Sequence, residues 1–111
     1  MLNQAVLVGR IVKEPELKIT ESGKKVSNIT LAVPRSFKNS NGEYDTDFIS
    51  CILWKGVAES TVSYCKQGDL VGIKGRIQTR NYEVNDEKKQ AVEVVAEKVT
   101  FLSSKRQEEA E

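Results

Sequence analysis

Hydrophobic and polar residues alternate along much of this chain, and alternation with a period of two is typical of β-strands. Alternating or β-branched stretches predict five strands, at residues 4–12, 26–33, 48–55, 70–82 and 91–102. Turn-forming residues separate these strands at 22–23, at 39–42, where Asn-Gly favours a hairpin tip, and at 85–89. We expect Pro34 to end the second strand, because proline cannot donate a hydrogen bond to a neighbouring strand.

One segment breaks this pattern and predicts a helix over residues 57–66. Apolar groups recur there with helical spacing, at Val57, Thr61, Tyr64 and Cys65. Gly68 follows where helices commonly end. The predicted order of three strands, a short helix and two strands is that of the OB fold. This fold is an all-β, five-stranded Greek-key barrel with one short helix between strands three and four.

The length of the chain limits it to one such domain. With 111 residues, it falls in the size range of a single domain with its own hydrophobic core. We expect the OB-fold domain to cover residues 1–103. A short charged tail, which we expect to be disordered, would follow at residues 104–111.

Period-two alternation divides the third predicted strand into two different sides. One side is compact and wholly apolar, so we assign it to the core; it carries Ile49, Cys51 and Leu53. The other side carries two large aromatic residues, Phe48 and Trp54. Aromatic residues outside a barrel usually mark a contact surface, so this side is a candidate binding face.

The fourth predicted strand alternates in the same way. Its inward positions are expected to be Val71, Ile73, Gly75 and Ile77. Its outward positions form a basic stripe with an aromatic end, at Lys74, Arg76, Arg80 and Tyr82. More cations and another aromatic lie near the ends of the second and third strands, at Arg35, Phe37, Lys38 and Lys55. Such interleaving suits single-stranded nucleic acid, because cations neutralise phosphates and aromatic rings stack on unpaired bases.

The composition excludes several other classes of protein. Histidine is absent, which removes the commonest general base and most zinc sites, and we predict no enzyme activity, metal or cofactor. Cys51 and Cys65 lie fourteen positions apart without a CxxC motif, so we expect buried free thiols. The longest run of Ala, Val, Ile and Leu covers only residues 5–8, too short for a membrane span or signal-peptide core. We therefore expect a cytoplasmic protein.

Two alternative functions fit the same residues. The formal net charge of +1 neither favours nor excludes an anionic partner. Phe48 and Trp54 could form a protein interface, as in a primosome-like OB-fold interaction module with weak DNA binding. Glu43, Asp45 and Asp47 could serve a metal-dependent nuclease, although three acids on one hairpin arm are more often solvated.

Several motifs together resemble the bacterial single-stranded DNA-binding protein family, over residues 1 to about 102. They are Leu-Asn-Gln-Ala-Val-Leu-Val-Gly-Arg at 2–10, Asn-Ile-Thr-Leu-Ala-Val at 28–33, and Asp-Phe-Ile at 47–49. The others are Leu-Trp-Lys at 53–55, Val-Gly-Ile-Lys-Gly-Arg-Ile-Gln-Thr-Arg at 71–80, and Glu-Val-Val-Ala-Glu at 93–97. The resemblance is to short members linked to natural competence or encoded by phages. Recruitment of repair or replication enzymes through an acidic tail tip is therefore not expected.

The resemblance implies a set of functional residues and partners. It implies that bases stack on Phe37, Phe48, Trp54 and Tyr82. It implies phosphate contacts from Arg10, Arg35, Lys38, Lys55, Lys74, Arg76 and Arg80. It further implies a homotetramer joined through the first strand, and a nucleoid-associated role in replication, recombination, repair or DNA uptake.

Overall fold

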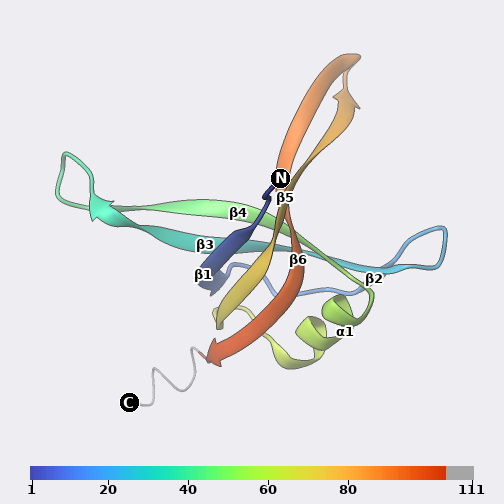
Figure 1. Cartoon of the computed structure of the whole chain (residues 1–111), viewed down its shortest axis with the longest axis horizontal. Coiled ribbons are helices and arrows are strands. Elements are labelled where there is room, and N and C mark those ends of the chain that lie inside the picture. The colour runs from blue at the N-terminus through green and yellow to red at the C-terminus, as the bar shows by residue number, and fades with distance from the viewer. Residues whose placement is uncertain (105–111) are drawn as a thin grey trace.

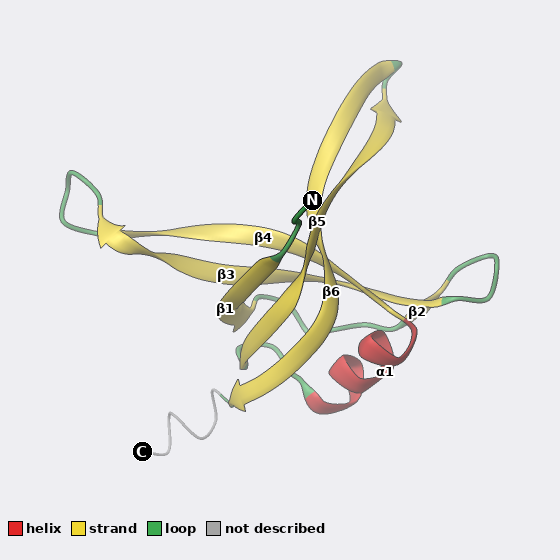
Figure 2. Cartoon of the chain, in the orientation of Figure 1, coloured by secondary structure: helices red, strands yellow, loops and turns green. Residues whose placement is uncertain are grey.

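Long strands carry most of the chain in the computed structural model, which describes residues 1–104 (Figures 1 and 2). The elements are β1 (Ala5–Ile11), β2 (Lys18–Ile19), β3 (Lys25–Lys38), β4 (Tyr44–Trp54), α1 (Lys55–Tyr64), β5 (Leu70–Val84) and β6 (Glu87–Ser103). No helix in this part of the chain is long and apolar enough to cross a membrane. The tail expected at 104–111 lies, apart from Ser104, outside the described residues.

The strands close into a barrel, which confirms the predicted OB fold. The sheet order is β1-β5-β6-β4-β3-β2, and β1 closes the barrel by also pairing with β3. All pairings are antiparallel except that between β4 and β6. The helix lies between β4 and β5, which are the third and fourth of the five long strands. The two-residue β2, which alternation does not predict, pairs only with the start of β3.

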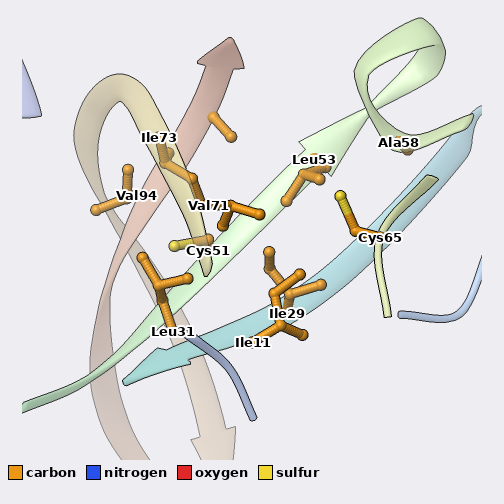
Figure 3. Packing of buried hydrophobic residues seen from close by; sticks show 11 residues of the cluster. Ile11, Ile29, Leu31, Cys51, Leu53, Ala58, Cys65, Val71, Ile73 and Val94 are labelled. Carbon is orange, nitrogen blue, oxygen red and sulfur yellow. The ribbon is translucent and has the colours of Figure 1, made fainter. Parts of the chain in front are cut away.

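The hydrophobic core fills the barrel and the space beneath α1 (Figure 3). It consists of Ile11, Ile29, Leu31, Cys51, Leu53, Ala58, Cys65, Val71, Ile73, Val94 and Ala96. The predicted inward positions Cys51, Leu53, Val71 and Ile73 are all buried, and both cysteines are free thiols as expected. Burying one such aliphatic side chain contributes about 1.5–3 kcal/mol, so this core supplies the main driving force for folding.

Two long hairpins leave the barrel in different directions (Figure 1). β3 and β4 form one, and its turn is held by the Asn39 side chain, which accepts hydrogen bonds from the backbone of Asn41 and Glu43. β5 and β6 form the other. Its tip is the two-residue turn Asn85-Asp86, in which both residues have positive φ, as a type I′ turn requires.

The expectation that Pro34 ends a strand is wrong, because β3 continues to Lys38. Pro34 pairs with Thr46 of β4, and the pairing becomes irregular between Pro34 and Lys38. On the other side, β1 pairs with β3 only as far as Ala32. Beyond that residue no other described strand pairs with this edge of β3, and a strand edge tolerates a residue that lacks an N–H donor.

A second expectation, that Ile77 faces the core, is also wrong. Ile77 is 47% exposed. A register shift separates Lys74 from Gly75, and a Cβ at Gly75 would collide with the Val95 carbonyl. Strands β5 and β6 cross closely at this bulge, and the hairpin then extends beyond the barrel. Ile77 therefore lies past the end of the core.

Three boundaries also differ from the sequence-based prediction. The helix begins at Lys55 and ends at Tyr64, and its buried residues are Ala58 and Thr61. Tyr64, one of the apolar groups that predict the helix, is exposed. The expected turn at 85–89 is shorter, because β6 already begins at Glu87. Strand β4 begins at Tyr44, whereas alternation predicts this strand only from residue 48.

Candidate nucleic-acid interface

The strand pairings bring the outward sides of β4 and β5 onto one surface. Ile52 of β4 is paired with Val95 of β6, and Val95 is paired with Arg76 of β5. On its other side, Ile52 is paired with Asn28 of β3. Directly paired residues project from the same side of a sheet. Arg76, Val95, Ile52 and Asn28 thus form one row across four strands, and we call this side of the sheet the outer face.

Phe48 lies on the outer face of β4, two and four residues from Ser50 and Ile52. Its side chain is 67% exposed. Its partner on β3 is Ala32, whose own partner on β1 is Arg10. The small side chain of Ala32 leaves the ring of Phe48 uncovered on that side. The Arg10 side chain is half-buried and donates a hydrogen bond of 3.0 Å to the Gly68 carbonyl.

Trp54 and Lys55 lie where β4 passes into α1. Trp54 is the N-cap of the helix, is half-buried, and is paired with Val26 of β3. Lys55 is exposed and has a φ of 51°, a left-handed conformation that turns the chain sharply from strand to helix. Alternation along β4 places Trp54 on the same side as Phe48. The outer face thus has an aromatic residue near each end of this stretch of β4.

The β5–β6 hairpin carries the basic stripe. The Arg80 guanidinium lies over the Tyr82 ring, 5.7 Å from its centre, and its Nε is 3.6 Å from Oε1 of Glu93 on β6. Tyr82 is 38% exposed and is paired with Lys89. Arg76 lies nearer the barrel and donates a hydrogen bond of 3.5 Å to Gln78.

Lys74 lies apart from the rest of this stripe. The bulge at Gly75 separates it from Arg76. Its paired residues are Val6 of β1 and Lys98 of β6, so its neighbours are those of the first strand. The structure therefore does not group Lys74 with the row formed by Arg76, Val95 and Ile52.

The β3–β4 hairpin carries Arg35, Phe37 and Lys38. Phe37 is 63% exposed, and the Lys38 ammonium lies 5.8 Å from the centre of the Tyr44 ring. Arg35 forms an ion pair of 3.0 Å with Asp47 and lies 3.8 Å from Asp45. Hydrogen bonds from Arg35 lower the pKa of Asp47 below its ordinary value, and the same bonds raise the pKa of Arg35.

The acidic residues of this hairpin do not form a metal site. Asp45 accepts a hydrogen bond of 3.1 Å from the Asn39 amide and, like Asp47, faces Arg35. Within residues 1–104, no group of three or more His, Cys, Asp and Glu residues could hold a metal ion. The structure thus gives the nuclease alternative no support.

Sequence reasoning missed two residues of the outer face, Lys89 and Glu93. The turn predicted at 85–89 includes Lys89, but this residue lies in β6 and is paired with Tyr82. Recognising Asn85-Asp86 alone as a two-residue turn would have placed it correctly. Glu93 is only 4% exposed, and it accepts a hydrogen bond of 2.8 Å from Gln78. Alternation alone does not pair Glu93 with Gln78, because the pairing depends on the register between β5 and β6.

These features together define a class of protein. An OB barrel that sets exposed aromatic rings among arginine and lysine side chains on one sheet face is suited to binding single-stranded nucleic acid. Bases stack on the rings while the cations follow the phosphates. Among the described residues, no helix is placed to enter the major groove of double-stranded DNA, because α1 packs against β3, β4 and β6 of the barrel.

Comparison with known families identifies the chain within this class. The model of the single-strand binding protein family matches residues 2–102, and the chain belongs to this family. The chain is 49% identical to single-stranded DNA-binding protein B of Bacillus subtilis, over 99% of this chain and 98% of that protein. It is 52% identical to single-stranded DNA-binding protein 3 of Listeria innocua, over 96% of this chain and 67% of that protein.

A solved structure agrees with these sequence relationships. The fold is similar to that of Plasmodium falciparum SSB in a complex with ssDNA, with a TM-score of 0.82 and 25% identity. The similarity covers 93% of this chain and 96% of that one. Other relatives are longer, and the chain spans 61% of the single-stranded DNA-binding protein of Halalkalibacterium halodurans. Resemblance to the family, inferred from the sequence motifs, is therefore confirmed.

Proposed function

We propose that this protein coats and protects single-stranded DNA without sequence preference, through the outer face of its OB-fold domain at residues 1–103. The observation that carries this proposal is that aromatic and basic side chains lie together on the outer face. Phe48 and Trp54 of β4 and Arg76, Arg80 and Tyr82 of β5 project from one side of a continuous sheet. Stacking on an aromatic ring stabilises a bound base by about 1–3 kcal/mol, and every base has a ring face to offer.

The two hairpins would extend this contact surface beyond the barrel. Phe37 and Lys38 would contribute from the β3–β4 hairpin, and Tyr82 from the β5–β6 hairpin. Arg10, Arg35, Lys55 and Lys74 are the remaining candidates for phosphate contacts. Arg10 and Arg35 already bind protein groups in the free protein, the Gly68 carbonyl and the Asp47 carboxylate. Phosphate contacts from these two arginines would require an exchange of partners.

We infer that the protein forms a homotetramer through β1, as its family is generally oligomeric. Two features of β1 support this inference. Val6 and Val8 project from it as exposed apolar side chains, and β1 pairs with β3 only at Arg10 and Ile11. An exposed, unpaired edge is a ready site for pairing with another chain. Sedimentation equilibrium tests this point, and a monomer at micromolar concentration would contradict it.

The proposed biological role is that of a binding protein and not of an enzyme. Family members are binding proteins, and two of the acids on the β3–β4 hairpin, Asp45 and Asp47, face Arg35. We infer that the protein acts in the cytoplasm, at the nucleoid, wherever strands are exposed in replication, recombination, repair or DNA uptake. No cofactor is required for stacking or for phosphate contacts.

Titration with oligo-dT tests the proposed surface directly, because Trp54 is the only tryptophan. We expect strong quenching of its fluorescence, affinity that falls steeply as salt rises, and no quenching by duplex DNA of the same length. Binding without quenching would move the contact away from Trp54. Absence of any binding at low salt would favour the interaction-module alternative, in which Trp54 contacts protein.

A further inference from the structure

A buried carboxylate lies within the proposed DNA-binding face. Glu93 is only 4% exposed, although its paired residue Gln78 lies between Arg76 and Arg80 of the basic stripe. A buried charge is costly unless it is paired and hydrogen-bonded. This charge also has the wrong sign for a surface that receives phosphates. Its position therefore requires an explanation beyond phosphate binding itself.

The contacts of Glu93 supply that explanation. One oxygen, Oε1, accepts a hydrogen bond of 2.8 Å from the Gln78 amide and lies 3.6 Å from Nε of Arg80. Arg80 keeps 58% of its side chain exposed, and its guanidinium lies 5.7 Å from the centre of the Tyr82 ring. The Nε side of the guanidinium thus faces a buried anion, while the group as a whole remains accessible to solvent and to the tyrosine.

We propose that Glu93 is a positioning residue for DNA binding: it holds Arg80 over Tyr82 so that phosphate and base contacts are formed by side chains already in place. This inference rests on the proposed function, which assigns Arg80 and Tyr82 to the contact surface. A free arginine side chain would lose rotamer freedom when it binds a phosphate. Glu93 removes part of that cost, because the side chain is ordered before the strand arrives.

The substitution Glu93→Gln separates positioning from charge. Glutamine has nearly the same shape and can still accept the hydrogen bond from Gln78, but it carries no negative charge to hold the Arg80 guanidinium. If Glu93 only repelled phosphates, E93Q would bind oligo-dT more tightly and with a steeper salt dependence. If Glu93 positions Arg80, E93Q binds about two- to tenfold more weakly, the range expected for ordering one long side chain.

The salt dependence gives a second readout that a purely structural role would not change. Loss of one phosphate contact on a single strand reduces the slope of log K against log salt by about 0.7. We expect the salt slope of E93Q to be smaller than that of the wild type, by up to about 0.7 for each protomer. Glu97→Gln is the matched control, because Glu97 lies on the same strand and is exposed. E97Q removes the same charge and is expected to bind as tightly as the wild type or slightly more tightly.

A double-mutant cycle with Arg80→Ala completes the test. We expect R80A to weaken binding, and E93Q to have no further effect in the R80A background. If R80A binds like the wild type, the proposed contact surface is wrong at Arg80. If R80A weakens binding but E93Q does not, the surface stands and the positioning role is overturned. Equal weakening by E93Q in both backgrounds overturns it too, because Glu93 would then act through the fold.

Arg80→Lys keeps the test usable if E93Q does not fold. Lysine retains the positive charge and leaves Glu93 in place, but it has no Nε beside its terminal group. A positioned guanidinium therefore predicts that R80K binds oligo-dT more weakly than the wild type. Equal affinity of R80K and the wild type would contradict the proposal.

Discussion

Arg35 and Asp47 form a forked ion pair across the β3–β4 hairpin. Nη2 of Arg35 lies 3.0 Å from Oδ1 of Asp47, and Nε lies 3.2 Å from Oδ2 and 3.3 Å from Oδ1. One of the cations expected to contact phosphate is thus already bound to a carboxylate. Both side chains are nearly half exposed, and an exposed ion pair contributes little to stability. A phosphate can therefore compete with Asp47 for Arg35.

Removing the charge of Asp47 is expected to strengthen DNA binding. Asp47→Asn removes the carboxylate that competes with phosphate for Arg35. The affinity for oligo-dT at low salt is therefore expected to rise several-fold. The slope of log K against log salt steepens by about 0.7 per protomer if one contact is gained. Fluorescence titrations of Trp54 at four or more salt concentrations measure both quantities.

Asp86→Asn provides the control for this prediction. It removes the same charge at the tip of the other hairpin, where the positive φ of residue 86 also suits asparagine. D86N is expected to leave the slope unchanged. Equal effects of D47N and D86N would show that only the total charge matters, and that Arg35 makes no contact of its own.

Phe48 is expected to contribute one stacked base. Phe48→Ala removes a ring that is largely exposed, so it costs little stability and weakens DNA binding by about 1–3 kcal/mol, roughly tenfold or more. Tyr64→Ala is the matched control, since Tyr64 is an exposed aromatic on α1, away from the outer face. Parallel titrations with oligo-dT compare the two variants. A similar loss in both would contradict an aromatic contact confined to the outer face.

Local alternation was sufficient to predict much of the core and of the outer face. A pleated strand must place Cys51 and Leu53 on one side and Phe48 on the other, and the closed barrel confirms that division. The same alternation wrongly predicts that Ile77 is buried in the core. Whether a residue at that position is covered depends on the bulge at Gly75, where β5 and β6 leave the barrel together.

The partners of the arginines were beyond sequence reasoning for a related reason. Glu93 meets Gln78 because β5 and β6 pair in one register, and Asp47 lies near Arg35 because β4 is paired with β3 beyond Ala32. A single sequence shows which residues are charged, but it does not fix the register of the strands. The sequence therefore predicts the aromatic residues and cations of the contact surface, but not that Asp47 and Glu93 lie against two of the arginines.

The two lysines near the tip of the β5–β6 hairpin are expected to differ in function. Lys89 is paired with Tyr82, on the side of the basic stripe, whereas Lys88 is paired with Glu83 and points to the opposite side. Lys89→Ala should weaken binding to oligo-dT and reduce the salt slope by about 0.7 per protomer. Lys88→Ala changes the same charge one residue away and should leave the slope unchanged. A larger effect of K88A would mean that the strand follows the other side of this hairpin.

Burial of Cys51 is expected to make stability depend on alkaline pH. Desolvation raises the pKa of the Cys51 thiol from 9.0 to about 11. Between these values the unfolded chain releases a proton that the folded protein retains, so the free energy of unfolding falls as the pH rises. The slope reaches at most about 1.4 kcal/mol per pH unit. Well below pH 9 this thiol contributes no pH dependence, because it is protonated in both states.

Cys51→Val isolates the contribution of this thiol from that of the other buried thiol, Cys65, whose pKa is also raised by burial. Valine fills a similar apolar volume and cannot ionise, so the variant should lose stability less steeply than the wild type between pH 9 and pH 11. Urea unfolding at fixed protein concentration measures the difference, since the stability of an oligomer depends on concentration. Parallel pH profiles for the two proteins would show that the Cys51 thiolate is tolerated in the core, contrary to its complete burial.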